Sequence, residues 1–218
     1  MTNRIYSEYK YLDWVRTMLD NATSQPEIAA ALAIVGYDAA VIAAGKQVYQ
    51  TAKKVFDKNK TEDDETRDAR KAYKTKIEEL TGIFKPHRAK AKVIFRNDQN
   101  TQEKLMISGS FPNSYPTLIQ RAEKFYNTLN ADSPLQEKVA VLKITPKEIK
   151  KGLQAISELQ SARNIYQAEI GESQEATKAK DGAITDLENW VKDFKDIAQI
   201  ALEDQPQLQE ALGILVRS

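Results

Sequence analysis

The clearest helical signal in the chain lies in residues 176–201, which read ATKAKDGAITDLENWVKDFKDIAQIA. Apolar side chains recur in this stretch with the three- and four-residue spacing that places them on one face of an α-helix. That face comprises Ala176, Ala183, Leu187, Trp190, Phe194, Ile197 and Ala201. Only Lys180 interrupts it. The stretch therefore predicts a helix that buries one side against a partner.

A similar pattern occurs earlier in the chain, at an offset of 107 residues and without a gap from about residue 37 onward. Equivalent positions carry the same or a similar small, apolar or acidic residue. They include Gly45 and Gly152, Glu62 and Glu169, Ala69 and Ala176, Ile77 and Ile184, Leu80 and Leu187, Ala91 and Ala198, Leu105 and Leu212, and Ile107 and Ile214. The period exceeds the roughly 20 to 50 residues of solenoid repeats, so each copy should be a self-sufficient unit.

The predicted fold is all-α, a tandem duplication of an up-and-down helical-bundle unit built on long antiparallel helices. We expect one unit in residues 1–110 and the other in residues 111–218, although the two could also pack as one continuous body. The boundary is placed in the linker 108–116, whose small residues and two prolines stop a helix.

Caps and turns complete the expected unit. Asp38 and Thr145 occupy equivalent positions and should each cap a long helix. A leading helix is expected at 3–20, short helices at 26–35 and 135–143, and closing turns at 102–107 and 206–212. The polar run 57–64 and the segment 168–171, which ends in a glycine, predict hairpin turns that fold each long helical segment back on itself.

The composition excludes several classes of chemistry. The chain has no cysteine and a single histidine, His87. Thiolate zinc sites, iron–sulfur clusters and cysteine nucleophiles are therefore excluded, and so is a di-iron bundle, which needs two histidines. No glycine-rich phosphate loop or nucleophile motif occurs. We expect no catalytic residue, no cofactor and no metal, and hence a protein that is not an enzyme.

The opening residues mix charges with aromatics and lack the pattern of a secretory signal, which predicts a cytoplasmic location. The longest low-charge run, 28–35, is too short to cross a bilayer, so no membrane span is expected.

Charge is nearly balanced over the whole chain, at a net +1. Residues 1–110 carry 19 Lys and Arg against 15 Asp and Glu, while residues 111–218 carry 13 against 16, so the halves stand at +4 and −3. This asymmetry could favour contact between the units or head-to-tail association of chains, although a random division of the charges often gives as much.

One local strip is basic, and it supplies the candidate binding residues. They are Lys85, His87, Arg88, Lys90, Lys92 and Arg96. The strip could contact phosphates, but the favoured interpretation is that Lys90 and Lys92 solvate one helix face while Ala89, Ala91, Val93 and Phe95 pack. His87 stands where the other copy has Phe194, so we expect a partly buried histidine that hydrogen-bonds a neighbour.

Three functions remain open on these grounds. The first is a non-catalytic interaction or scaffold protein that binds a protein partner or a second copy of itself. The alternative is binding of a polyanion, either nucleic acid or an anionic membrane, through the strip 85–96. Small-ligand binding or catalysis in a pocket between helices is the third.

Overall fold

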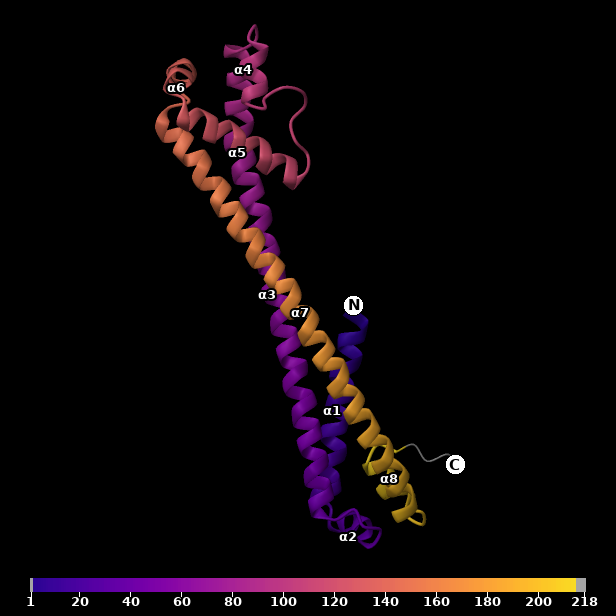
Figure 1. The fold of residues 1–218 in the computed structure, drawn as a ribbon. Coiled ribbons are helices and arrows are strands. Elements are labelled where there is room, and N and C mark those ends of the chain that lie inside the picture. Colours follow the sequence, from indigo (N-terminus) through magenta and orange to yellow (C-terminus); the bar gives the residue numbers. More distant parts are fainter. Residues whose placement is uncertain (1, 215–218) are drawn as a thin grey trace. The chain divides into compact units, whose positions relative to one another are not determined.

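The computed structural model describes residues 2–214, with side chains described from Ser7 onward (Figure 1). Within this range the chain is all-α and contains no strand, which confirms the all-α part of the prediction. The helices are α1 (Thr2–Ser24), α2 (Pro26–Ile34), α3 (Ala39–Ile94), α4 (Gln99–Lys104), α5 (Tyr115–Ala131), α6 (Ser133–Ala140), α7 (Pro146–Ala201) and α8 (Pro206–Ala211).

The expected hairpin turns at 57–64 and 168–171 are wrong, because α3 and α7 run through them as unbroken helices of 56 residues each. The polar run holds neither proline nor glycine, and Lys58 pairs with Glu62 one helical turn away. Such pairs at i and i+4 support a helix. Gly171 weakens α7 by about 1 kcal/mol relative to alanine, which is too little to end a helix that is packed along its length.

The chain divides into two compact units. Each unit combines one end of α3 with the opposite end of α7. Unit 1 comprises residues 1–63 and 172–218, and unit 2 comprises residues 64–171. They therefore do not coincide with the sequence halves 1–110 and 111–218. The difference arises because the hairpin turns expected at 57–64 and 168–171 do not form. Each half of α3 therefore packs on a segment of α7 rather than on the other half of α3.

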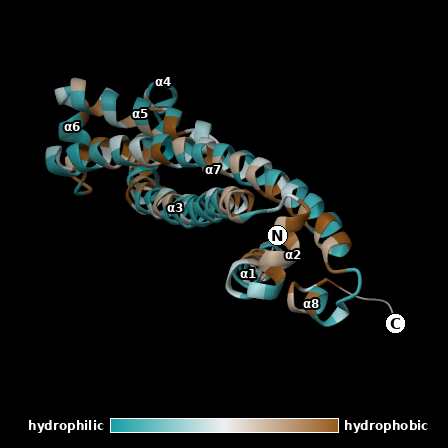
Figure 2. Cartoon of the chain, turned by 90° about the horizontal axis from the view of Figure 1, so that it is seen from below, coloured by the Kyte–Doolittle hydropathy of each residue, from teal (hydrophilic) through white to brown (hydrophobic). Residues whose placement is uncertain are grey.

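Within each unit, segments of α3 and α7 run antiparallel. In unit 1, Asn59 donates to Thr177 at 3.1 Å and Ser173 donates to Asp63 at 2.9 Å. In unit 2, the hydroxyl of Thr66 donates to the carbonyl of Glu169 at 3.1 Å. Figure 2 shows α7 alternating between hydrophilic and hydrophobic residues along its length, as expected of a helix with one buried face.

The core of unit 1 explains the single polar interruption of the apolar face. Leu187, Phe194 and Ala198 are buried there together with residues of α1 and α2. Lys180 is also buried, and its Nζ lies 2.7 Å from the carboxylate of Glu8 on α1. A charge at that position is tolerated because it is paired.

The core of unit 2 is aromatic. Phe84 of α3 contacts Phe125 of α5 with ring centroids 5.5 Å apart, and Phe125 in turn contacts Tyr126 edge to face. Tyr73 and Tyr115, which are equivalent to Lys180 and Glu8 at the offset of 107, contact each other with centroids 5.8 Å apart. A ring pair in one unit thus stands where the other unit has an ion pair.

The predicted caps are confirmed. The Asp38 carboxylate accepts from the backbone N–H groups of Ala40 and Val41 at 2.9 and 3.1 Å, and the Thr145 hydroxyl accepts from the N–H of Glu148 at 3.3 Å. Each cap binds N–H groups that the first turn of a helix leaves without an internal partner.

The paired glycines Gly45 and Gly152 each face an aromatic ring of another helix. A Cβ at Gly45 would lie 2.1 Å from Trp190 of α7, and a Cβ at Gly152 would lie 2.3 Å from Tyr126 of α5. Both distances are far below van der Waals contact. The absence of a side chain at these two positions is therefore what admits the rings.

Among the described helices, none by itself combines the length and apolar character of a membrane span. Taken together, α2 and α3 meet those criteria, but they are bent by 106° with respect to each other.

Candidate functional site

Five of the six residues of the predicted basic strip lie on α3 in unit 2, and Arg96 follows just after this helix ends at Ile94. The structure does not bring the six residues together on one exposed surface. Lys85 and Arg96 are exposed, Lys90 and Lys92 are half-buried, and His87 and Arg88 are buried. The expected packing of the neighbours is correct for Ala91 and Phe95, which are buried, and wrong for Ala89 and Val93, which are exposed. Those two point outward because the buried face of α3 follows Leu80, Phe84 and Ala91.

Arg88 holds the linker that follows α4. Its Nη2 donates to the carbonyls of Ser108, Gly109 and Ser110 at 3.0, 2.7 and 3.1 Å. Lys92 Nζ donates to the Gly109 carbonyl at 2.7 Å. These bonds satisfy carbonyls of a segment that has no regular secondary structure of its own.

A third cation reaches the same carbonyls from another helix. Arg121 of α5 donates to Ser110 at 2.7 Å through Nη1. No local sequence pattern pointed to Arg121, because only the packing of α5 on α3 brings it near the linker. Arg88, Lys92 and Arg121 together form what we call the linker clamp.

The linker clamp has no acidic counterpart. Within the described part of the chain, no carboxylate forms an ion pair with any of its three cations. Burial, and then the proximity of Arg121, lowers the pKa of Arg88. Burial, followed by Arg88 and Arg121, lowers the pKa of Lys92. The Nε of Arg88 is also buried without a hydrogen-bond partner. Within the linker clamp, the repulsion among the three cations is therefore opposed by their hydrogen bonds to the linker carbonyls.

His87 hydrogen-bonds a neighbour, as predicted, and it is buried rather than partly buried. Its Nδ1 lies 2.9 Å from the hydroxyl of Tyr126, and its Nε2 lies 3.8 Å from the carboxylate of Glu148. Burial lowers the pKa of His87, against an opposing effect of Glu148, while Lys90 and Lys151 lower it further. Burial thus favours the neutral imidazole, which contributes packing and one hydrogen bond to the core of unit 2.

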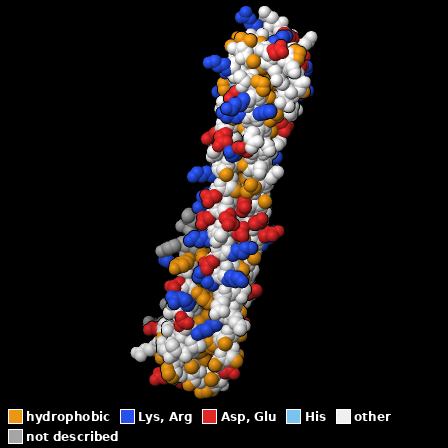
Figure 3. All heavy atoms as spheres, turned by 90° about the vertical axis from the view of Figure 1, so that its left-hand side faces the viewer, with side chains coloured by type: hydrophobic (Ala, Val, Ile, Leu, Met, Phe, Trp, Pro, Cys, Tyr) orange, Lys and Arg blue, Asp and Glu red, His pale blue; other side chains and the backbone are white. Residues whose placement is uncertain are grey.

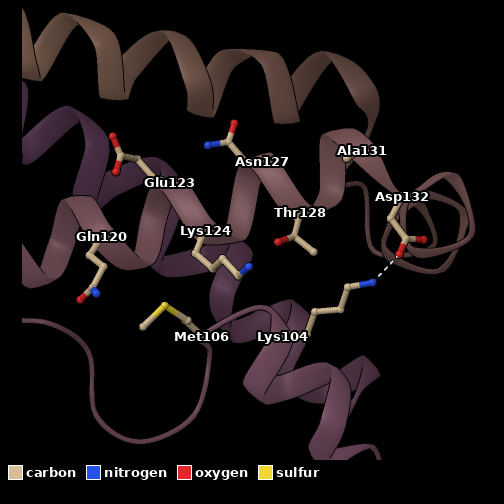
Figure 4. A pocket seen from close by; sticks show the side chains of 9 residues that line it. All are labelled: Lys104, Met106, Gln120, Glu123, Lys124, Asn127, Thr128, Ala131 and Asp132. Atoms are coloured by element: carbon tan, nitrogen blue, oxygen red, sulfur yellow. Dashed lines mark hydrogen bonds and ion pairs between the residues drawn. The ribbon is translucent and has the colours of Figure 1, made fainter.

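A hollow of about 670 Å³ opens beside α4 and α5 in unit 2 (Figure 4). Its lining residues are Lys104, Met106, Gln120, Glu123, Lys124, Asn127, Thr128, Ala131 and Asp132. Lys104 and Asp132 form an ion pair of 2.7 Å along its margin. The lining offers amides, ammonium groups, carboxylates and the hydroxyl of Thr128, a set of polar groups that suits contact with a polar surface. The sequence did not single out these residues, because they come from segments that meet only after folding.

The net charges of the two units differ far more than the net charges of the two sequence halves do. Unit 1 carries 13 Lys and Arg against 18 Asp and Glu, a net −5, whereas unit 2 carries 19 against 13, a net +6. This separation arises because the C-terminal part of α7 belongs to unit 1. Residues 172–218 bring ten acidic side chains and five basic ones to that unit.

No protein family, curated protein or solved structure matches this chain.

Proposed function

We propose that the chain is a non-catalytic interaction protein whose helical units present charged surfaces to macromolecular partners. The observation that carries this proposal is the separation of charge, with net −5 in unit 1 and +6 in unit 2. Opposite charges gathered on separate bodies give each body an electrostatic preference for its own partners and accelerate encounter with them. The cytoplasmic location expected from the sequence belongs to the same proposal.

Tandem duplication of a helical unit is part of this proposal, and the element bounds support it. The helices α3 and α7, and likewise α4 and α8, begin and end at residues 107 apart. Positive φ angles recur at the same offset, at Gly36 and Lys143 and again at Met106 and Gly213. A left-handed backbone at a lysine or methionine is uncommon, so its coincidence with glycine in the other copy favours common descent.

Affinity capture tests the proposed function. The folded chain is immobilised and exposed to host lysate at about 50 mM salt, where attraction between exposed charges acts over more than 10 Å. We expect macromolecules to be retained and then released as salt rises, and a column bearing an unrelated helical protein of the same net charge to retain a different set. Retention of nothing beyond that control, together with strictly monomeric light scattering, would refute the proposal.

A second candidate, polyanion binding by unit 2, is favoured by the exposed face of α3. Arg67, Lys71, Lys74 and Lys85 fall within roughly 60° of one another at 100° per residue, and all four are exposed. A shallow hollow of about 410 Å³ lies along the part of this face near Lys71. The candidate surface therefore extends beyond the strip 85–96 toward the start of unit 2.

Fluorescence titration with a labelled single-stranded oligonucleotide, repeated over a range of salt, tests this second candidate. We expect affinity to fall steeply with salt, with a slope that drops by about one to two units in the double variant Lys71→Gln, Lys85→Gln. The matched control is Lys178→Gln, Lys192→Gln, which changes the equivalent exposed positions of α7. Equal behaviour of the two double variants, or no binding at low salt, would exclude the polyanion surface.

A further inference from the structure

Two structurally equivalent corners of the chain carry opposite charge. The acidic corner, residues 26–45, comprises α2 and the first turns of α3, and the basic corner, residues 133–152, comprises α6 and the first turns of α7. The acidic corner has two carboxylates, Glu27 and Asp38, and no Lys or Arg. The basic corner has five lysines against two glutamates, a net +3. The first corner belongs to unit 1 and the second to unit 2.

Each corner also exposes a large aliphatic side chain at the same place. Ile34 is 86% exposed and Val141 is 79% exposed, and the two positions are 107 residues apart. An aliphatic side chain left in water forgoes about 1.5 to 3 kcal/mol of burial free energy. Single exposed apolar residues are ordinary, but retention of one at the same corner in both copies indicates a surface that is covered in use.

The acidic corner is shaped to receive such a side chain. A hollow of about 390 Å³ lies between α1, α2 and the start of α3, and its lining is mainly small and apolar, including Ala29, Ala30, Ala33, Tyr37 and Ile42. Figure 3 shows hydrophobic side chains gathered at the end of unit 1 where α2 and α8 lie. A valine side chain is small enough to enter this hollow.

We propose that the acidic corner of one molecule docks on the basic corner of a second copy of the same chain. The inference rests on the proposed interaction function and names its partner. Opposite charge sets the pairing, since two acidic or two basic corners facing each other would place like charges together. The contact joins different surfaces, so each bound pair keeps one free corner of each kind and association continues into rings or open chains.

Sedimentation velocity over a concentration series is the first test. At about 20 mM NaCl we expect species larger than the monomer, growing with protein concentration, and a weight-average size that falls toward the monomer at about 500 mM NaCl. A chain that remains monomeric at every concentration in low salt would overturn the proposal.

Two single variants then test the geometry. Ile34→Lys disables the acidic corner and Val141→Glu disables the basic corner, and each alone should lower the association constant at least tenfold. Mixed together they should form heterodimers and nothing larger, because each variant supplies the one intact corner that the other lacks. If Val141→Glu alone still associates as the wild type does, or if the mixture stays monomeric, head-to-tail docking is refuted.

Controls separate docking from misfolding. Ile165→Lys alters another exposed aliphatic residue, 53% exposed and outside both corners, and should associate as the wild type does. The double variant Lys147→Glu, Lys150→Glu reverses charge at exposed positions in the first turns of α7, where acidic residues suit the helix dipole, so the fold should persist while association weakens at least tenfold. Unchanged association of this double variant would count against the charge pairing. Capture of another partner by a strictly monomeric chain would reject self-docking and leave the interaction function standing.

Discussion

The substitution Gly152→Ala adds a single methyl group inside α7 where the structure leaves no room for it. The new Cβ would lie 2.3 Å from Cζ of Tyr126, whereas carbon atoms in contact are about 3.5 to 4.0 Å apart. Tyr126 is fully buried and packs on Phe84 and Phe125 while bonding His87, so its ring cannot retreat without disturbing the core of unit 2.

The magnitude follows from three contributions. Overpacking a core typically costs about 1 to 3 kcal/mol. Displacing Tyr126 from His87 removes a buried hydrogen bond, at a further cost of about 1 kcal/mol. Alanine in place of glycine stabilises a helix interior by about 1 kcal/mol, which offsets part of the loss. We therefore expect the free energy of unfolding to fall by about 1 to 3 kcal/mol.

The same substitution elsewhere in the helix should have the opposite sign. Gly171 lies in α7 and unit 2 as well, but a Cβ there would meet nothing within 4 Å. Gly171→Ala should therefore raise the free energy of unfolding by about 0.5 to 1 kcal/mol.

In unit 1, Gly45→Ala should lower the free energy of unfolding by less than Gly152→Ala does. The ring that its Cβ would meet belongs to Trp190, which is only half-buried. Gly182→Ala is the matched control in this unit, because a Cβ there would meet nothing within 4 Å.

Urea unfolding followed by far-ultraviolet circular dichroism measures these differences, with the midpoint and slope compared for each variant. The slope also reports whether the two units unfold together, which is needed before a single free energy is assigned. If Gly152→Ala proves as stable as Gly171→Ala, the close packing of Tyr126 against α7 is refuted.

Three further predictions concern buried polar groups. Lys180→Met should destabilise the fold by about 3 kcal/mol because it removes the ammonium group that pairs with the buried Glu8 carboxylate at 2.7 Å. Adding Glu8→Met should restore most of that loss. Equal unfolding midpoints for the single and double variants would contradict this. The lowered pKa of His87 means that the unfolded chain binds a proton at His87 more readily than the folded chain does. The free energy of unfolding should therefore decline as pH falls below the ordinary histidine pKa of 6.5. Urea unfolding at several pH values measures this decline, and His87→Gln should flatten it. Arg88→Ala should lower stability by about 2 kcal/mol and speed amide hydrogen exchange in the linker. Arg96→Ala changes an exposed arginine just after the end of α3 and should stay within about 0.5 kcal/mol of the wild type. Linker exchange equal in both variants would show that Arg88 does not hold the linker.

The candidate residues were only partly predictable from the sequence. A run of basic residues from Lys85 to Arg96 is visible without a structure, and the burial of His87 follows from its match with Phe194. The division of that run into an exposed part and a linker clamp was not predictable, because Arg121 and the carbonyls of Ser108 to Ser110 approach α3 only through the packing of α5.

Local chemistry was enough to predict the helical class, the capped starts at Asp38 and Thr145, and the burial of Ala176, Leu187 and Phe194 on one face of α7, because capping and periodic apolar spacing act over a few residues. The path of the chain at 57–64 and 168–171 was beyond such reasoning. A polar run can form a turn or continue a helix at similar free energy, so the choice depends on what packs beside it. Tertiary packing decided that α3 and α7 are continuous helices. Each unit therefore combines one end of α3 with the opposite end of α7, which gives one unit a net charge of −5 and the other +6.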